Sequence, residues 1–225
     1  MTIQLSENYP KLIRDLFLYD VGVQYYPSEE LTCDQIFEQI AYMPIDLGKS
    51  VDYKAMLDEA TELPYIQSST DADRCYMYGP TGTKDPRCER IDSNHKEFEY
   101  KINMDGCPTI KTFIEQVSEI GQITYLSFKR MLPKHFINPH VDSICNPFKI
   151  YVPLTWPTGN YFKMYKKGFI PFEPLVPFLV NTGNHVHSVI NDSNEDRYIF
   201  SFYADWGSDK WQKIIKNSYG KLIKD

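Results

Sequence analysis

The sequence predicts a mainly β protein, an antiparallel sandwich or barrel of the jelly-roll kind, with helices packed on it from the N-terminal side. Two observations lead to this fold class. Apolar residues recur with helical spacing in the first 120 residues, and after Gly121 the spacing changes to the alternation typical of β-strands. In addition, 17 Tyr and 13 Phe contribute to an aromatic fraction of 15%, which favours a sheet-rich folded protein over disorder.

Three helices are expected before Gly121. Thr32 or Asp34 can cap the first, because their side-chain oxygens accept hydrogen bonds from the N–H groups of a first helical turn. Pro64 ends the second, and Pro108 lies in the first turn of the third, where its missing N–H is tolerated. The helices are predicted over residues 31–43, 50–63 and 108–120.

Residues 68–95 are polar, rich in Gly, Pro and Asp, and too long for a simple connector. Two interpretations fit this composition. With Arg74, Arg87 and Arg90 the segment would form a lid or a substrate-recognition flap. A solvated surface loop is the commoner case, and we favour it.

Seven short apolar stretches follow one another in the second half of the chain, and Gly, Pro and Asn separate them as hairpin and corner turns require. They span residues 123–132, 135–142, 148–156, 160–168, 176–183, 186–191 and 197–205. Residues 206–225 are expected as a surface helix or a basic tail. We expect a single domain over residues 1–225, in which residues 1–120 pack on a β core of residues 121–205.

Charge and cysteine content restrict the kind of partner and the compartment. The net charge is −6 and Lys and Arg are scattered, so no basic face indicates a nucleic-acid partner. Five cysteines, none in CxxC spacing, indicate neither a disulfide framework nor a thiolate zinc site. The chain has no signal-peptide pattern and no uncharged apolar run of about 18 residues, so we expect a soluble cytoplasmic protein.

His140 and Asp142 lie two residues apart in a predicted strand, so their side chains should point to the same face of a sheet. A His-x-Asp pair alone is weak evidence for a metal. A further histidine from a later strand would complete a set of two histidines and one carboxylate, which leaves three coordination positions open and suits non-haem Fe(II). His187 can supply this donor, and His185, which would face the same way, is its rival.

Arg197 lies in the next apolar strand, ten residues after His187 (197 − 187). An inward-pointing guanidinium needs a partner, and its fork of donors suits a carboxylate. If that partner is the distal carboxylate of 2-oxoglutarate, the keto-acid end is left to chelate the iron. Lys149 is a second candidate for contact with this acid.

The motifs "PHVD", "KIYVPL" and "HSVIN", followed by Arg197, resemble the aspartyl/asparaginyl β-hydroxylase-like branch of the Fe(II)/2-oxoglutarate oxygenases. The resemblance covers residues 121–205 and implies a double-stranded β-helix of the cupin type. It also implies that His140, Asp142 and His187 ligate iron and that Arg197 anchors 2-oxoglutarate. The "HSVIN" motif thereby selects His187 over His185.

The chain departs from the family pattern at two positions. The strand before "PL" usually begins with arginine and often carries a histidine two residues later, where this chain has Lys149 and Tyr151. These two positions belong to the second set of contacts to 2-oxoglutarate in the family. Some members lack the carboxylate ligand, whereas Asp142 is present here, which favours a complete triad.

Three further residues carry weaker signals. Asn191 either closes the polar turn that follows its strand or contributes to the site. His135 and His95 are expected as ordinary surface histidines.

The function expected from these motifs is a dioxygenase that uses Fe(II), 2-oxoglutarate and dioxygen to hydroxylate an amino acid, a peptidyl residue or a related small substrate. Two alternatives remain at this stage. One is a non-catalytic cupin-like metal-binding or structural protein. The other is an enzyme that uses zinc or another divalent metal as a Lewis acid.

Overall fold

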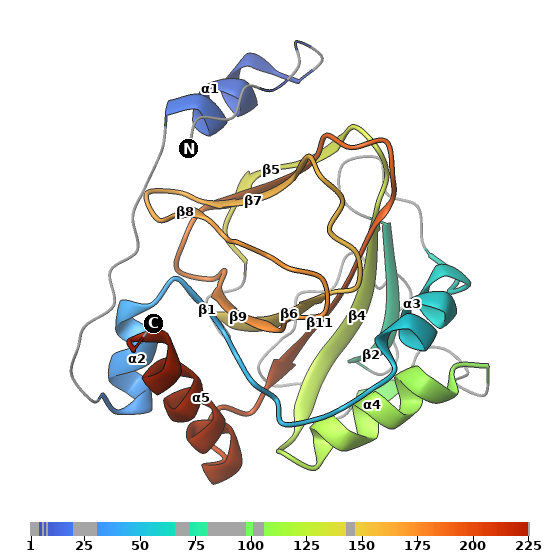
Figure 1. Ribbon diagram of the computed structural model, residues 1–225, viewed down its shortest axis with the longest axis vertical. Helices are drawn as coiled ribbons and strands as arrows, with labels where there is room; N and C mark the ends of the chain where they lie inside the picture. Colours follow the sequence, from blue (N-terminus) through green and yellow to red (C-terminus); the bar gives the residue numbers. More distant parts are fainter. Residues whose placement is uncertain are drawn as a thin grey trace.

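The computed structural model describes residues 5, 7, 9–19, 31–65, 73–80, 98–100, 106–142 and 147–224. Among the described residues, two antiparallel sheets face each other as the walls of a flattened barrel, and four helices pack around the larger one (Figure 1). These four are α2 (Cys33–Gln39), α3 (Tyr53–Thr61), α4 (Pro108–Ser118) and α5 (Asp209–Leu222), and a fifth helix among the described residues is α1 (Lys11–Tyr19). This architecture is the predicted jelly-roll.

In the part of the chain that the structure describes, the larger sheet has seven strands, and each neighbouring pair is antiparallel. In spatial order they are β1 (Tyr42–Pro44), β9 (Phe178–Asn181), β6 (Phe148–Pro153), β11 (Arg197–Ala204), β4 (Ile123–Met131), β2 (Asp73–Pro80) and β3 (Phe98–Tyr100). The smaller sheet consists of β5 (His135–His140), β10 (His187–Asn191), β7 (Asn160–Met164) and β8 (Gly168–Phe169). All seven predicted stretches contain strands, so the period-two pattern after Gly121 is confirmed.

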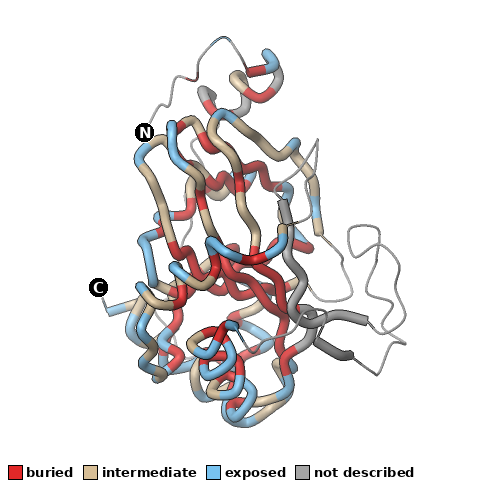
Figure 2. Tube along the Cα trace, turned by 90° about the vertical axis from the view of Figure 1, so that its right-hand side faces the viewer, coloured by how far each residue is buried: buried red, intermediate tan, exposed pale blue. Residues whose placement is uncertain are grey.

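The outer face of the larger sheet carries the main hydrophobic core. Phe113 of α4 packs edge to face on Phe200 of β11, with ring centroids 5.6 Å apart. Trp211 of α5 is fully buried, and its ring centroid lies 6.2 Å from that of Phe202. Figure 2 shows the most continuous burial along these strands and exposure on the outward sides of the helices. The segment expected as a surface helix or tail is therefore α5, a helix with one buried face.

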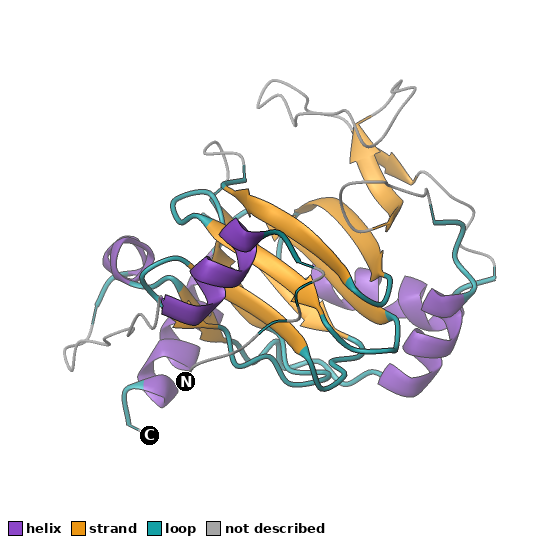
Figure 3. Cartoon of the chain, turned by 90° about the horizontal axis from the view of Figure 1, so that it is seen from above, coloured by secondary structure: helices purple, strands orange, loops and turns teal. Residues whose placement is uncertain are grey.

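The inner faces of the two sheets enclose a second core, and α1 covers the outer face of the smaller sheet (Figures 1 and 3). Phe17 of α1 packs against Tyr161 and Phe169, at centroid distances of 6.2 and 5.6 Å. The inner core consists of Ala41, Met131, Tyr151, Phe162, Met164, Ile170, Phe172, Phe178, Val180, Val189 and Ile199. The space between the sheets is where a site can be enclosed.

The helix predicted over residues 31–43 is shorter than expected. Thr32 caps it and forms a capping box with Gln35, but α2 ends at Gln39 because Ile40 adopts an extended backbone, with φ −89° and ψ 141°. Tyr42 and Met43 then pair with β9 in the larger sheet. Sheet pairing overrides the helical spacing at this point, although Met43 is buried either way. The helices expected over residues 50–63 and 108–120 are confirmed as α3 and α4.

Part of the segment 68–95, expected as a loop, is a strand. β2 pairs with β4, and Cys75 lies opposite Phe128 in the register. Most of the remaining segment, including Arg87, Arg90 and His95, lies outside the described residues. Within the described ranges, no helix is long and apolar enough to cross a membrane.

Candidate metal centre

His140, Asp142 and His187 come together between the two sheets. Each offers a ligand atom, and these atoms lie within 4.8 Å of one another. The Nε2 atom of His140 is 3.5 Å from Oδ1 of Asp142, and the rings of His140 and His187 have centroids 4.3 Å apart. Among the residues that the structure describes, no other group of three histidine, cysteine or carboxylate side chains is arranged for a metal ion.

An irregularity in β5 helps to place His140. The register pairs His140 with His187 and then Ile137 with Val189, so β5 carries one residue more than β10 between these pairs. Pro139 lies in this bulge and has no N–H to contribute to the ladder. The hydroxyl of Ser188 donates to the carbonyl oxygen of Ile137 at 2.7 Å.

Asp142 reaches the site from beyond the end of its strand. β5 ends at His140, so the expectation that His140 and Asp142 share one regular strand is wrong. The backbone N–H of Asp142 donates to the carbonyl oxygen of Thr182, just after β9, at 2.9 Å. This tertiary hydrogen bond, and not strand alternation, fixes Asp142 beside His140.

Both imidazoles turn the same nitrogen toward the backbone. Nδ1 of His140 lies 2.7 Å from the carbonyl oxygen of Asn138. Nδ1 of His187 lies 3.1 Å from the carbonyl oxygen of His185. Because a carbonyl oxygen can only accept, Nδ1 carries the hydrogen, and Nε2 of the neutral ring presents a lone pair. Two Nε2 atoms and the Asp142 carboxylate are therefore acceptors gathered at one point, a donor set that fits a divalent metal ion.

The charge of Asp142 is held by its neighbours. Burial alone would raise the pKa of this carboxyl, but the ammonium of Lys149, supported by that of Lys129, outweighs burial and lowers the pKa. The pKa of Asp142 therefore lies well below its ordinary range. Nζ of Lys149 is 3.1 Å from Oδ2 of Asp142, and the Lys149 side chain is only 4% exposed.

His187 is kept neutral by its surroundings. Its ring stacks on Phe162 at a centroid distance of 5.2 Å and an interplanar angle of 12°. Burial lowers the pKa of His187 to about 4 and outweighs the nearby Asp142 carboxylate, which would raise it. A neutral imidazole is the form that binds a metal.

The cavity beside the three ligand candidates is lined by two cations and by apolar side chains. Its lining residues are Lys129, Ile137, His140, Asp142, Tyr151, Phe162, His187, Val189, Arg197 and Ile199. Arg197 is buried at the start of β11, and its guanidinium lies over the Trp156 ring, 5.2 Å from the centroid. Burial raises the pKa of Tyr151 well above its usual value, so the phenol keeps its proton and can donate a hydrogen bond.

Sequence reasoning missed Lys129, and the predicted contact of Lys149 with the acid stays a prediction. Lys129 faces the cavity from β4, because strand alternation places it opposite to the buried Leu126 and Phe128. Alternation alone would assign such a lysine to solvent. Lys149 is not among the cavity-lining residues; its ammonium lies 4.6 Å from the Tyr203 ring centroid, next to Asp142.

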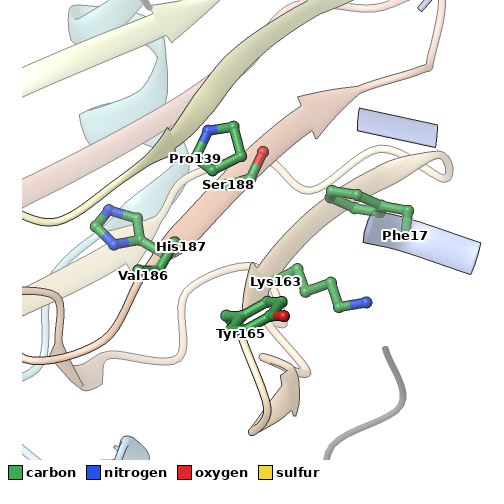
Figure 4. Close-up of a pocket in the computed structure, with 7 residues that line it drawn as sticks. All are labelled: Phe17, Pro139, Lys163, Tyr165, Val186, His187 and Ser188. Carbon is green, nitrogen blue, oxygen red and sulfur yellow. The ribbon is translucent and has the colours of Figure 1, made fainter. Parts of the chain in front are cut away.

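His185, the rival ligand, contributes its backbone to the site. Its carbonyl oxygen accepts the Nδ1 hydrogen of His187, while its imidazole is partly exposed and lies outside the three-residue group. Figure 4 shows the other side of this region, where Val186 and Tyr165 lie near His187 and Phe17 comes from α1. This outer hollow measures about 10 Å³, space for at most a water molecule.

Asn191 closes the turn between β10 and β11 and does not line the cavity. Its Oδ1 accepts from the Ser193 hydroxyl at 2.6 Å and from the Asn160 amide at 3.0 Å. Its Nδ2 donates to the carbonyl oxygens of Met131 and Glu195, at 2.9 and 2.8 Å. Of the two roles considered for Asn191, closing the turn is the one observed.

The comparisons with known proteins agree with this fold and these motifs. The family model described as "Aspartyl/Asparaginyl beta-hydroxylase" matches residues 91–204, about half of the chain. No curated protein matches the sequence.

Solved structures with a similar fold include an oxidoreductase of the 2OG-Fe(II) oxygenase family from Burkholderia pseudomallei. It is 15% identical, the match covers 81% of this chain and 95% of that one, and the TM-score is 0.53. A prolyl hydroxylase from Trichoplax adhaerens, in complex with a hypoxia inducible factor peptide fragment, is 10% identical, with 80% and 88% coverage and a TM-score of 0.51. At these identities the likeness shows the fold alone.

Proposed function

Because this chain belongs to the aspartyl/asparaginyl β-hydroxylase family, we propose that it is a non-haem Fe(II)- and 2-oxoglutarate-dependent dioxygenase that hydroxylates its substrate. The observation that carries the proposal is the convergence of His140, Asp142 and His187 inside the barrel. In this proposal the iron would be held by Nε2 of His140, a carboxylate oxygen of Asp142 and Nε2 of His187. Such a set leaves three coordination positions open.

The chemistry itself belongs to the cofactor: bound Fe(II), with 2-oxoglutarate and dioxygen, supplies oxidative decarboxylation to succinate and CO2 and hydroxylation of a C–H bond. The protein supplies the ligand geometry, because Nδ1 of each histidine is fixed by a backbone carbonyl. It also supplies an anionic ligand, since the pKa of Asp142 is held low. Phe162 and Val189 add apolar surface to the cavity next to His187.

Two cations of the cavity match the charge of 2-oxoglutarate. We assign the distal carboxylate to Arg197, whose planar guanidinium can hold it with two parallel hydrogen bonds. Lys129 lines the same cavity from the neighbouring strand, and the Tyr151 phenol can donate to the same anion. The cavity measures about 30 Å³, so the flexible Lys129 and Arg197 side chains must shift when the acid enters. Contact between Lys149 and the acid stays a prediction.

The substrate class is proposed more broadly, as an amino acid, a residue in a peptide or a related small molecule. We also keep the cytoplasm as the predicted compartment. A zinc enzyme is the second metal-dependent candidate, and the pair of cavity cations argues against it, because Lewis-acid hydrolysis needs no dicarboxylate co-substrate. The non-catalytic alternative is not favoured for a member of a hydroxylase family.

One experiment tests the proposed function. Purified protein is loaded with Fe(II) without oxygen, 2-oxoglutarate is added, and the visible charge-transfer absorption of a chelated keto acid is recorded. Air is then admitted in the presence of a panel of amino acids and peptides, and succinate is quantified. We expect both the absorption and succinate that depends on iron. Stoichiometric iron binding without the absorption and without succinate would contradict the proposal and favour the non-catalytic alternative.

A further inference from the structure

The two oxygens of the Asp142 carboxylate face different partners. Oδ1 lies 3.5 Å from Nε2 of His140, one of the candidate ligand atoms. Oδ2 lies 3.1 Å from Nζ of Lys149. One carboxylate oxygen therefore faces His140 and the other faces a buried ammonium. The Asp142 backbone is fixed separately, by its hydrogen bond to the carbonyl oxygen of Thr182.

Lys149 is built into the wall behind Asp142. It belongs to β6, which is buried along its whole length, and it pairs with Val180 of β9. Its ammonium lies 4.6 Å from the Tyr203 ring centroid and 5.6 Å from that of Tyr151. Aromatic faces on two sides and the carboxylate in front restrict the ammonium to the vicinity of Oδ2. A lysine at 3% exposure is expensive to bury unless it is paired, and Asp142 is such a partner.

We propose that Lys149 is a positioning residue for the metal ligand Asp142: it holds Oδ2 so that Oδ1 alone is offered to the metal. This inference rests on the proposed function. It gives Lys149 a role other than contact with 2-oxoglutarate. A carboxylate that bound through both oxygens would occupy a further coordination position, and one of the three positions required by the co-substrate and dioxygen would be lost. Lys149 therefore keeps the third position available.

The test compares Lys149→Met with Lys129→Met, a matched loss of one ammonium from the same region. Affinity for Mn(II) or Co(II) is measured calorimetrically without 2-oxoglutarate, and the KM for 2-oxoglutarate is measured at saturating Fe(II). For Lys149→Met we expect metal affinity to fall about 10- to 100-fold, as is typical when a group that orients a ligand is removed, with KM changed less than about threefold. For Lys129→Met we expect the opposite result: a raised KM for 2-oxoglutarate and nearly unchanged metal affinity.

The Co(II) spectrum gives a readout that a purely structural role would not move. If Lys149 restrains Oδ2, the visible bands of the Co(II)-loaded Lys149→Met protein should differ from those of the parent, and Lys149→Arg should restore them in part. Unchanged metal affinity and an unchanged spectrum in Lys149→Met, with KM raised, would overturn the proposal and make Lys149 a co-substrate contact.

A double variant covers the case in which Lys149→Met does not fold because Asp142 is left buried without its cation. Asp142→Ala with Lys149→Met removes both charges and avoids an unpaired one. If Lys149 acts through Asp142, this protein should bind Co(II) as weakly as Asp142→Ala alone, and a further clear loss would contradict the inference. Both readouts are independent of turnover, so failure of this inference and failure of the proposed function, which shows as absent succinate, are distinguishable.

Discussion

His187 lies directly opposite His140 in the register of β10 and β5, and the two rings have centroids 4.3 Å apart. Forty-seven residues separate them in the chain (187 − 140), so only the pairing of these strands brings them together. His185 lies two residues before His187 and offers a carbonyl oxygen in place of its ring. The difference between these two histidines gives the first prediction.

Replacement of His187 by Ala should reduce affinity for Fe(II) or Co(II) by at least about 100-fold, because one of three converging ligand atoms is removed. His185→Ala is the matched control. It keeps the backbone carbonyl that orients the His187 ring, so metal affinity should stay within about threefold of the parent value. Calorimetric titration of the metal measures both. Loss of binding in His185→Ala with retention in His187→Ala would reverse the ligand assignment.

Arg197→Ala should raise the KM for 2-oxoglutarate about 10- to 100-fold, the loss expected for a charge-assisted pair of hydrogen bonds, while metal affinity stays nearly unchanged. Arg130→Ala is a suitable control, because this arginine lies on β4 and stacks on Tyr65, away from the cavity lining. Initial rates of succinate formation over a range of 2-oxoglutarate concentrations give the answer. Equal KM values in the Arg197→Ala variant and the parent would show that Arg197 does not bind 2-oxoglutarate.

The low pKa of His187 predicts a pH dependence of stability in the metal-free protein. In the unfolded chain this imidazole has a pKa of 6.5, and in the folded protein burial lowers the pKa to about 4. Between these values the unfolded state binds more protons, so the contribution to stability is present above pH 6.5 and is lost as the pH falls toward 4. From pH 7.5 to pH 5 we expect the free energy of unfolding to fall by about 2 kcal/mol because of this residue.

Urea unfolding in the presence of a chelator measures this loss. His187→Gln, which cannot titrate, serves as the comparison and should lose about 2 kcal/mol less than the parent over the same pH interval. The remaining histidines and the carboxylates are common to both proteins and cancel. An equal loss in the two proteins would show that His187 does not titrate with a lowered pKa.

The sequence contains enough to predict the β core and the three ligand candidates, because alternation, turn residues and motif order are local properties. It does not contain the tertiary contacts that complete the site. Asp142 is fixed by Thr182 of another segment, and a strand end cannot be read from a pattern that continues past it. Lys129 has the alternation of a solvent-facing residue, and only the closure of the barrel turns it to the cavity.

The same limit explains the errors outside the site. Residues 40–43 continue the helical spacing of α2, yet the strand pairs of Tyr42 and Met43 with β9 outweigh that weak local preference. β2 lies in a polar stretch without a strand pattern, and among the described strands it is next to the short edge strand β3 of the larger sheet. Long-range pairing decides both elements, and no local pattern encodes it.

The last prediction concerns Asn191, which joins the end of β4 to the turn before β11, the strand that begins with Arg197. The Asn191 amide joins Met131 at the end of β4 to Glu195 and Ser193 in the turn before β11. Asn191→Ala leaves these buried groups without their partner and should lower the free energy of unfolding by about 3 kcal/mol. Asn194→Ala removes an exposed side chain from the same turn and should change it by less than about 0.5 kcal/mol. Chemical denaturation measures both, and similar values for the two variants would refute a bracing role for Asn191.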